Sequence, residues 1–155
     1  MRLLIDTNIL LYAANQSVAE HPRARQFLED HLRSGTSWCL TWPVIYEFLR
    51  VSTHPRIFSK PLKADEAMRY VDALFASPSL TMLVPGSRHR GLLQQTLSEI
   101  GSPAGNLFHD IATAVTMREH GVPEIVTADS DFHQFEFLSV RNPMLSTPPA
   151  GSPRR

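Results

Sequence analysis

The chain has 155 residues, 43% of them hydrophobic and 19% charged, which is enough for one globular domain with a buried core. Its formal net charge is zero, so attraction of the whole protein to nucleic acid is not evident, and local patches would have to supply it. A single cysteine, Cys39, excludes an internal disulfide.

Strand-like and helix-like segments alternate from the start of the chain. Arg2–Ile5 is a short apolar run that predicts a buried strand, and Thr7 or Asn8 is expected to cap a helix over Ile9–Ala14. A proline in its first turn and a glycine after its end bound the next predicted helix, Pro22–Arg33. The first half continues with a strand, a helix behind a short turn and a further helix after a loop: Trp38–Leu40, Val44–Leu49 behind Thr41–Pro43, and Ala64–Ala76.

The second half repeats the alternation. Thr81–Val84 predicts a third strand, and Arg88–Ile100 has the apolar periodicity of an amphipathic helix. Leu107–His120 predicts another helix, which Gly121 ends. The last two strand candidates are Glu124–Thr127 and Phe137–Val140. This order of elements is typical of an α/β fold with a central, mostly parallel sheet.

We expect a single domain over residues 1–142 and a disordered C-terminal tail over residues 143–155, because the end of the chain is rich in Pro, Ser and Gly. The apolar run before Asp6 is too short for a signal peptide. No stretch reaches the ~18 apolar residues of a membrane span. We therefore expect a cytoplasmic protein without a membrane partner.

Four acidic residues stand beside predicted strands or within predicted helices: Asp6, Glu47, Asp110 and Asp129. Asp6 and Asp129 each follow a strand, and ligands of open α/β sheets bind at the carboxyl ends of the strands. Asp110 lies in the first turn of a helix, where the helix dipole favours a negative charge. Glu47 lies on an otherwise apolar helix. Carboxylates gathered beside apolar segments need a cation, and an all-oxygen site suits Mg²⁺, with Mn²⁺ as a substitute.

The fourth acidic position has two candidates. Asp129 and Asp131 lie two residues apart, so either could face the pocket while the other caps the following turn. We favour Asp129 because it follows the strand more closely, and a role for both stays open. The other acidic side chains are interpreted as solvated charges: Asp65, Glu66, Asp72, Glu99, Glu119 and Glu136.

These motifs, in this order, resemble those of the PIN-domain ribonucleases, and most of all the VapC-type toxins of type II toxin–antitoxin systems. The resemblance rests on Asp6-Thr7-Asn8 after the first strand, a helical glutamate about forty residues later, Asp110 at a helix start, and the segment Thr127–Phe132 (Thr-Ala-Asp-Ser-Asp-Phe) after a strand. It covers residues 1–142 and implies a three-layer α/β/α fold around the sheet.

The resemblance also implies an activity: hydrolysis of an RNA phosphodiester by a metal-activated water, leaving a 5′-phosphate and a 3′-hydroxyl. It implies Asp6 and Asp110 as direct metal ligands, with Glu47 and Asp129 completing the site directly or through water. Three neighbouring polar residues are expected to orient the carboxylates by hydrogen bonds: Thr7, Asn8 and Thr127. The implied partners are an RNA substrate, such as transfer RNA or another structured RNA, a VapB-like antitoxin and a second copy of the chain in a homodimer.

A stretch without acidic residues follows Glu47 and is a candidate for binding RNA phosphates. Its basic residues are Arg50, Arg56, Lys60 and Lys63. The alternative interpretation is a solvated loop with no role in binding. Trp38 and Trp42 are interpreted as core residues, with base stacking by either as the alternative.

Two other functions compete with an endoribonuclease. A non-catalytic PIN-like module could bind RNA without cutting it, although retention of all four acids argues against this. A metal-dependent phosphohydrolase of the haloacid dehalogenase type would need a second aspartate two residues after Asp6, where this chain has Asn8.

Overall fold

A five-stranded parallel sheet forms the centre of the protein, which we describe from a computed structural model for residues 2–145. The strand order is β3-β2-β1-β4-β5, and every neighbouring pair is parallel. The strands are β1 (Leu3–Ile5), β2 (Trp38–Thr41), β3 (Leu80–Leu83), β4 (Glu124–Val126) and β5 (Ser139–Arg141).

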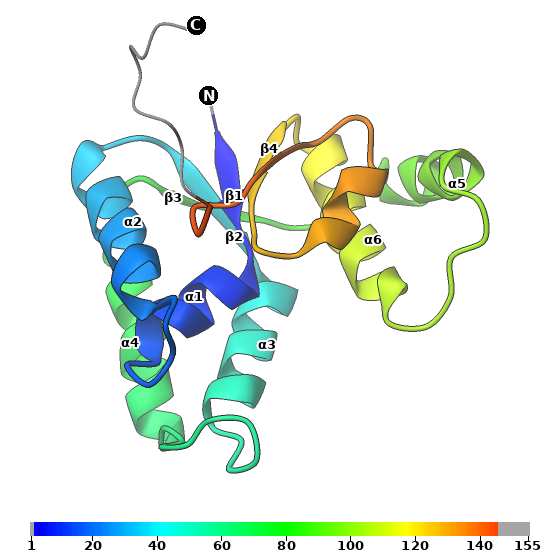
Figure 1. Ribbon diagram of the computed structural model, residues 1–155. Coiled ribbons are helices and arrows are strands. Elements are labelled where there is room, and N and C mark those ends of the chain that lie inside the picture. The colour runs from blue at the N-terminus through cyan, green and yellow to red at the C-terminus, as the bar shows by residue number, and fades with distance from the viewer. Residues whose placement is uncertain (1, 146–155) are drawn as a thin grey trace, which may run out of the picture.

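Helices cover both faces of the sheet and complete a three-layer α/β/α architecture, which confirms the predicted fold class (Figure 1). Helices α1 to α4 lie on one side, and α5, α6 and the short 3₁₀ helix η1 lie on the other. Their bounds are α1 (Thr7–Ala14), α2 (His21–Ser34), α3 (Trp42–Ser52), α4 (Ala64–Phe75), α5 (His89–Glu99), α6 (Leu107–Glu119) and η1 (Ser130–Gln134).

The central strands are buried along their whole length, as expected for a parallel sheet covered by helices on both faces. Leu4 of β1 pairs with Cys39 of β2 on one side and with Ile125 of β4 on the other, and none of the three is exposed to solvent. The edge strands β3 and β5 are partly exposed.

Several element boundaries differ from the sequence-based expectation by one to three residues, among them the starts of the first helix and of the fifth strand. The first helix begins at Thr7, and its cap is Asp6, whose carboxylate accepts a hydrogen bond from the Thr7 N–H. The fifth strand begins at Ser139, because Phe137 is held outside the sheet by the Phe135 ring, 5.9 Å away, and by the Arg118 guanidinium.

Two side chains lie in environments that the sequence analysis did not expect. Trp42 is 46% exposed and stacks on Phe75 at 5.9 Å, so it is not a core residue, whereas Trp38 is fully buried. Glu119, interpreted above as a solvated charge, is buried beneath the segment between β3 and α5. Both errors arise from tertiary packing that local patterns do not encode.

The predicted tail is only partly described. Residues 143–145 form a turn in which the Leu145 N–H donates to the Asn142 carbonyl, and residues 146–155 lie outside the described part of the chain. Within residues 2–145, none of the helices combines the length and the apolar character that a bilayer span requires.

Candidate active site

The acidic residues gather beside the middle of the sheet, where the order of the strands along the chain changes direction. From β1 the chain moves to β2 and β3 on one side, while β4 and β5 lie on the other, which makes the β1–β4 junction the switch point. The Asp6 N–H donates to the Val126 carbonyl at 3.0 Å, so the residues that follow β1 and β4 emerge together.

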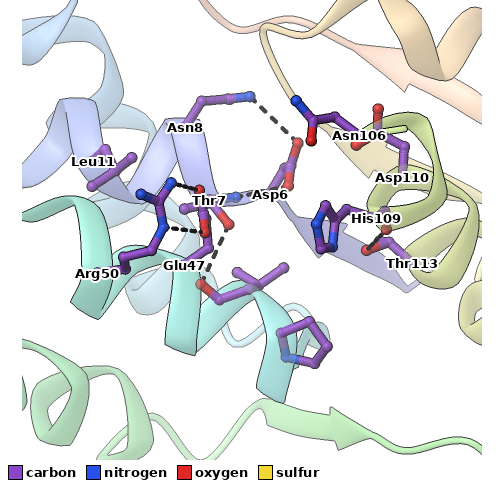
Figure 2. Close-up of a pocket in the computed structure, with 12 residues that line it drawn as sticks. Asp6, Thr7, Asn8, Leu11, Glu47, Arg50, Asn106, His109, Asp110 and Thr113 are labelled. Carbon is purple, nitrogen blue, oxygen red and sulfur yellow. Dashed lines mark hydrogen bonds and ion pairs between the residues drawn. The ribbon is translucent and has the colours of Figure 1, made fainter. Parts of the chain in front are cut away.

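A pocket of about 640 Å³ opens at this junction between α1 and α3 on one side and α6 on the other (Figure 2). Three of the four predicted acids, Asp6, Glu47 and Asp110, line it. The remaining lining residues are Thr7, Asn8, Leu11, Pro43, Val44, Arg50, Asn106, His109 and Thr113.

Asp6 is fixed in place by three donors. One carboxylate oxygen accepts from the Thr7 N–H at 2.8 Å, and the other accepts from the Thr127 hydroxyl at 2.8 Å and the Asn8 amide at 3.3 Å. These bonds favour the ionised form, but burial and the neighbouring charges of Asp129 and Glu47 oppose them. Burial is the larger effect, and the pKa of Asp6 is raised above its ordinary value.

The side chains of Asn8 and Thr127 join the two ends of the site. The Asn8 amide donates to the Thr127 hydroxyl at 3.0 Å and accepts from the Ala128 N–H at 3.0 Å. The Thr127 hydroxyl also accepts from the Asp129 N–H at 3.0 Å. Two of the three polar residues predicted to orient the carboxylates, Asn8 and Thr127, therefore join the β1 end to the β4 end. The hydroxyl of the third, Thr7, donates to the Val44 carbonyl of α3.

Asp110, Asp129 and Asp131 form the tightest acidic group. One carboxylate oxygen from each lies within 4.8 Å of the others. Asp129 also accepts from the Asp131 N–H at 2.9 Å, as the cap of η1. Both candidates for the fourth acid, Asp129 and Asp131, thus lie beside Asp110, and the geometry is compatible with a role for either or both.

Asp110 differs from Asp6 in the hydrogen bonding of its carboxylate. Within residues 2–145, no N–H or O–H group donates to its carboxylate. Burial, followed by the charges of Asp129, Asp6 and Asp131, raises the pKa of Asp110 to about 7. A carboxylate in this state is stabilised by an added cation.

Glu47 differs from the other acids because it already has a cationic partner. The Arg50 guanidinium binds it through two contacts, of 3.0 Å from Nε and 2.6 Å from a terminal nitrogen. This pairing outweighs partial burial and lowers the pKa of Glu47. Glu47 therefore faces the pocket as a fully ionised group outside the tight aspartate cluster.

Of the four basic residues proposed from the sequence, only Arg50 lines the pocket. Arg56 and Lys60 lie in the loop beyond the end of α3, and Lys63 precedes α4, where its N–H donates to Glu66. Figure 1 shows that loop at the end of α3 remote from the sheet. The geometry thus separates Arg50 from the rest of the basic stretch.

Sequence reasoning missed several residues of the pocket wall. Asn106 and Thr113 lie four residues before and three after Asp110, and Pro43 lies four residues before Glu47. These spacings put residues on one helical face. Helical periodicity around each predicted acid would have found them.

The donor set fits a hard divalent cation. It consists of carboxylate oxygens and includes no thiolate. A nearby cation would stabilise the ionised form of one of its members, Asp110. Mg²⁺ and Mn²⁺ both meet that description.

Comparison with known proteins places this geometry in a family. Residues 3–138 match the PIN domain model. The chain is 31% identical over 142 residues to Ribonuclease VapC33 of Mycobacterium tuberculosis, covering 92% of this chain and 98% of that protein. It is 32% identical over 133 residues to Ribonuclease VapC37 of the same species, covering 86% and 91%.

Solved structures share the fold. VapBC2 from Rickettsia felis, bound to a promoter DNA fragment, has a TM-score of 0.67 at 19% identity and covers 92% of this chain and 98% of that one. VapC20 of Mycobacterium tuberculosis, a toxin that cleaves the sarcin–ricin loop, has a TM-score of 0.65 at 18% identity and covers 90% and 99%.

Proposed function

The chain belongs to the PIN-domain family and to its VapC ribonucleases, and from that premise we propose that it is an endoribonuclease toxin that uses a divalent cation and is neutralised by an antitoxin. The observation that carries this proposal is the Asp110 carboxylate. It lies beside two further aspartates at the switch point of the sheet, without a donor in the described residues.

Mg²⁺, or Mn²⁺ in its place, is the proposed cofactor. Asp6, Asp110 and Asp129 would hold it, with Glu47 acting directly or through water and Asp131 as a further acid beside Asp110. When bound, such an ion lowers the pKa of a water molecule and neutralises the charge that develops on the phosphate.

The chain's own residues prepare the site for that ion. Thr127 and Asn8 hold Asp6 in one orientation, because they bond to its carboxylate and to each other. The Asp129 N–H donates to the same Thr127 hydroxyl. A shift of either strand end would therefore move both acids together.

The proposed partners are RNA, an antitoxin and a second copy of the chain. The substrate is a structured RNA such as transfer RNA, and the reaction leaves a 5′-phosphate and a 3′-hydroxyl. A VapB-like antitoxin blocks the acidic pocket, where a guanidinium can pair with the carboxylates. The VapBC structures with this fold support an antitoxin partner.

The direct test is cleavage of RNA by the purified chain. We expect cuts with Mg²⁺ or Mn²⁺, none after chelation, and none from the Asp6→Asn variant with an unchanged circular dichroism spectrum. Mapping of 5′ ends after controlled expression would identify the RNA. Binding of RNA without cleavage under every metal condition would favour the non-catalytic module instead.

A further inference from the structure

Arg50 is the one lysine or arginine on the pocket wall within residues 2–145, where it faces Asp6, Glu47 and Asp110. We propose that Arg50 binds an RNA phosphate adjacent to the scissile one, and that its contact with Glu47 opens to receive that phosphate. This inference rests on the proposed function, since it assigns a substrate subsite within the same pocket.

The shape of the guanidinium supports the exchange. Arg50 presents Nε and a terminal nitrogen side by side to the two oxygens of Glu47, at 3.0 and 2.6 Å. Two non-bridging oxygens of a phosphodiester offer the same paired acceptors. The phosphate can therefore replace the carboxylate without a change in the donor geometry.

Because the ion pair between Arg50 and Glu47 is exposed, breaking it costs little free energy. The Arg50 and Glu47 side chains are 59% and 47% exposed, and they lie three residues apart on one helix. Exposed ion pairs of this kind contribute little to stability, so water or a phosphate can displace one partner. A buried pair would resist the same step.

The position of Arg50 indicates a flanking phosphate. Figure 2 shows Arg50 and Leu11 at one end of the pocket, and Asn106 and Asp110 at the other. The acidic cluster occupies the Asp110 end, where the phosphodiester would be cut. Arg50 would then hold the backbone at a neighbouring nucleotide and set the direction of the strand along α3.

Binding of a fluorescent RNA that spans the mapped cleavage site tests this proposal. Fluorescence anisotropy is measured with the full chain carrying Asp110→Asn, which prevents turnover. Arg50→Ala should raise Kd about tenfold and reduce the slope of log K against log salt by about one. Arg50→Lys keeps the positive charge but loses the paired donors of the guanidinium, so its Kd should lie between those of the Asp110→Asn parent and Arg50→Ala. Arg69→Ala is the matched control, because Arg69 also pairs within a helix, with Asp65, but does not line the pocket.

A double variant separates contact from charge. Removal of Arg50 leaves Glu47 unpaired, which alone could repel RNA. If Arg50 touches the phosphate, Glu47→Gln combined with Arg50→Ala should still bind at least about fivefold more weakly than the Asp110→Asn parent. Full recovery in the double variant, or equal effects of Arg50→Ala and Arg69→Ala, would overturn the subsite.

Steady-state kinetics in the otherwise unchanged chain provide a second readout. Arg50→Ala should raise KM about tenfold and keep kcat within about threefold, as expected when ground-state binding is lost. A loss confined to kcat would contradict the flanking position. If the unmodified chain cuts no RNA, the proposed function fails, whereas cleavage with an unaffected KM in Arg50→Ala removes only the subsite.

Discussion

Helix α6 carries a carboxylate near each end, and the fold treats the two in opposite ways. Glu119, in the last turn, has a side chain that is only 5% exposed, and it accepts from the Gly86 N–H at 2.9 Å and the Arg88 N–H at 3.1 Å. These bonds, with His89 nearby, lower its pKa. Asp110, in the first turn, has no donor among the described residues, and its pKa is raised to about 7.

The difference distinguishes a structural acid from one kept for an external partner. Glu119 is compensated by backbone donors, so its charge holds the segment before α5 against α6. Asp110 faces other acids, so its charge opposes folding unless a cation compensates it. The fold tolerates that cost at one end of the helix only, beside the switch point of the sheet.

The largest expected effect is the loss of activity in Asp110→Asn. The rate of RNA cleavage should fall at least ~10³-fold, because the cation loses a ligand and the cluster loses charge. The melting temperature of the metal-free variant should rise by roughly 2–4 °C, because an uncompensated charge is removed. Differential scanning calorimetry measures the melting temperature, and a cleavage assay measures the rate. If the variant is both inactive and less stable, Asp110 stabilises the fold as Glu119 does, and the contrast between them is wrong.

Glu119→Ala should show the converse pattern. The melting temperature should fall by roughly 5 °C, since the backbone N–H groups of Gly86 and Arg88 lose the acceptor that holds their segment against α6. Cleavage measured well below that temperature should stay within about threefold of the unmodified chain. If Glu119→Ala loses cleavage without losing stability, Glu119 has a role in the reaction and the contrast with Asp110 is wrong.

The two acids should also give opposite pH dependences in metal-free protein. The folded pKa of Asp110 lies above its ordinary value of 3.8, so its contribution to the free energy of unfolding falls as pH rises from about 4 to about 7. The folded pKa of Glu119 lies below 4.5, so its contribution is present above that pH and is lost as pH falls through the folded value. Unfolding by urea across this range, for the unmodified chain, Asp110→Asn and Glu119→Gln, isolates each contribution. Parallel profiles for the unmodified chain and Asp110→Asn would refute the raised pKa.

The smallest expected effect concerns Gly86. A Cβ at this position would lie 2.7 Å from Glu119 Oε1, which accepts from the Arg88 N–H, while Oε2 accepts from the Gly86 N–H. Gly86→Ala should lower the melting temperature by roughly 2 °C, and the loss should vanish when Glu119 is also replaced by alanine. An equal loss in both backgrounds would show that the strain has another source.

Sequence patterns predicted the parts of this protein that depend on local order. The alternation of apolar runs indicated the parallel sheet, and the strand ends placed Asp6 and Asp129 on one edge. The resemblance of these motifs to VapC toxins was confirmed by the PIN domain match together with the VapC relatives. The metal-binding roles stay predictions until a cation is measured.

The remaining features depend on contacts between distant segments. The position of Asp131 beside Asp110 follows from the turn into η1, which the spacing of the two aspartates did not specify. Burial of Glu119 requires the segment around Gly86, 33 residues earlier in the chain. The direction of the loop after α3, which separates Arg56 from Arg50, is likewise set by packing.

Isothermal titration calorimetry of Mn²⁺ binding to the metal-free chain at pH 8 is the most direct test of the role of Asp110. Its carboxylate has no donor among the described residues and is expected to bind the cation. We predict saturable binding by the unmodified chain and by Glu119→Gln, and its loss in Asp110→Asn. Absence of binding by the unmodified chain, or equal affinity in Asp110→Asn, would contradict the account.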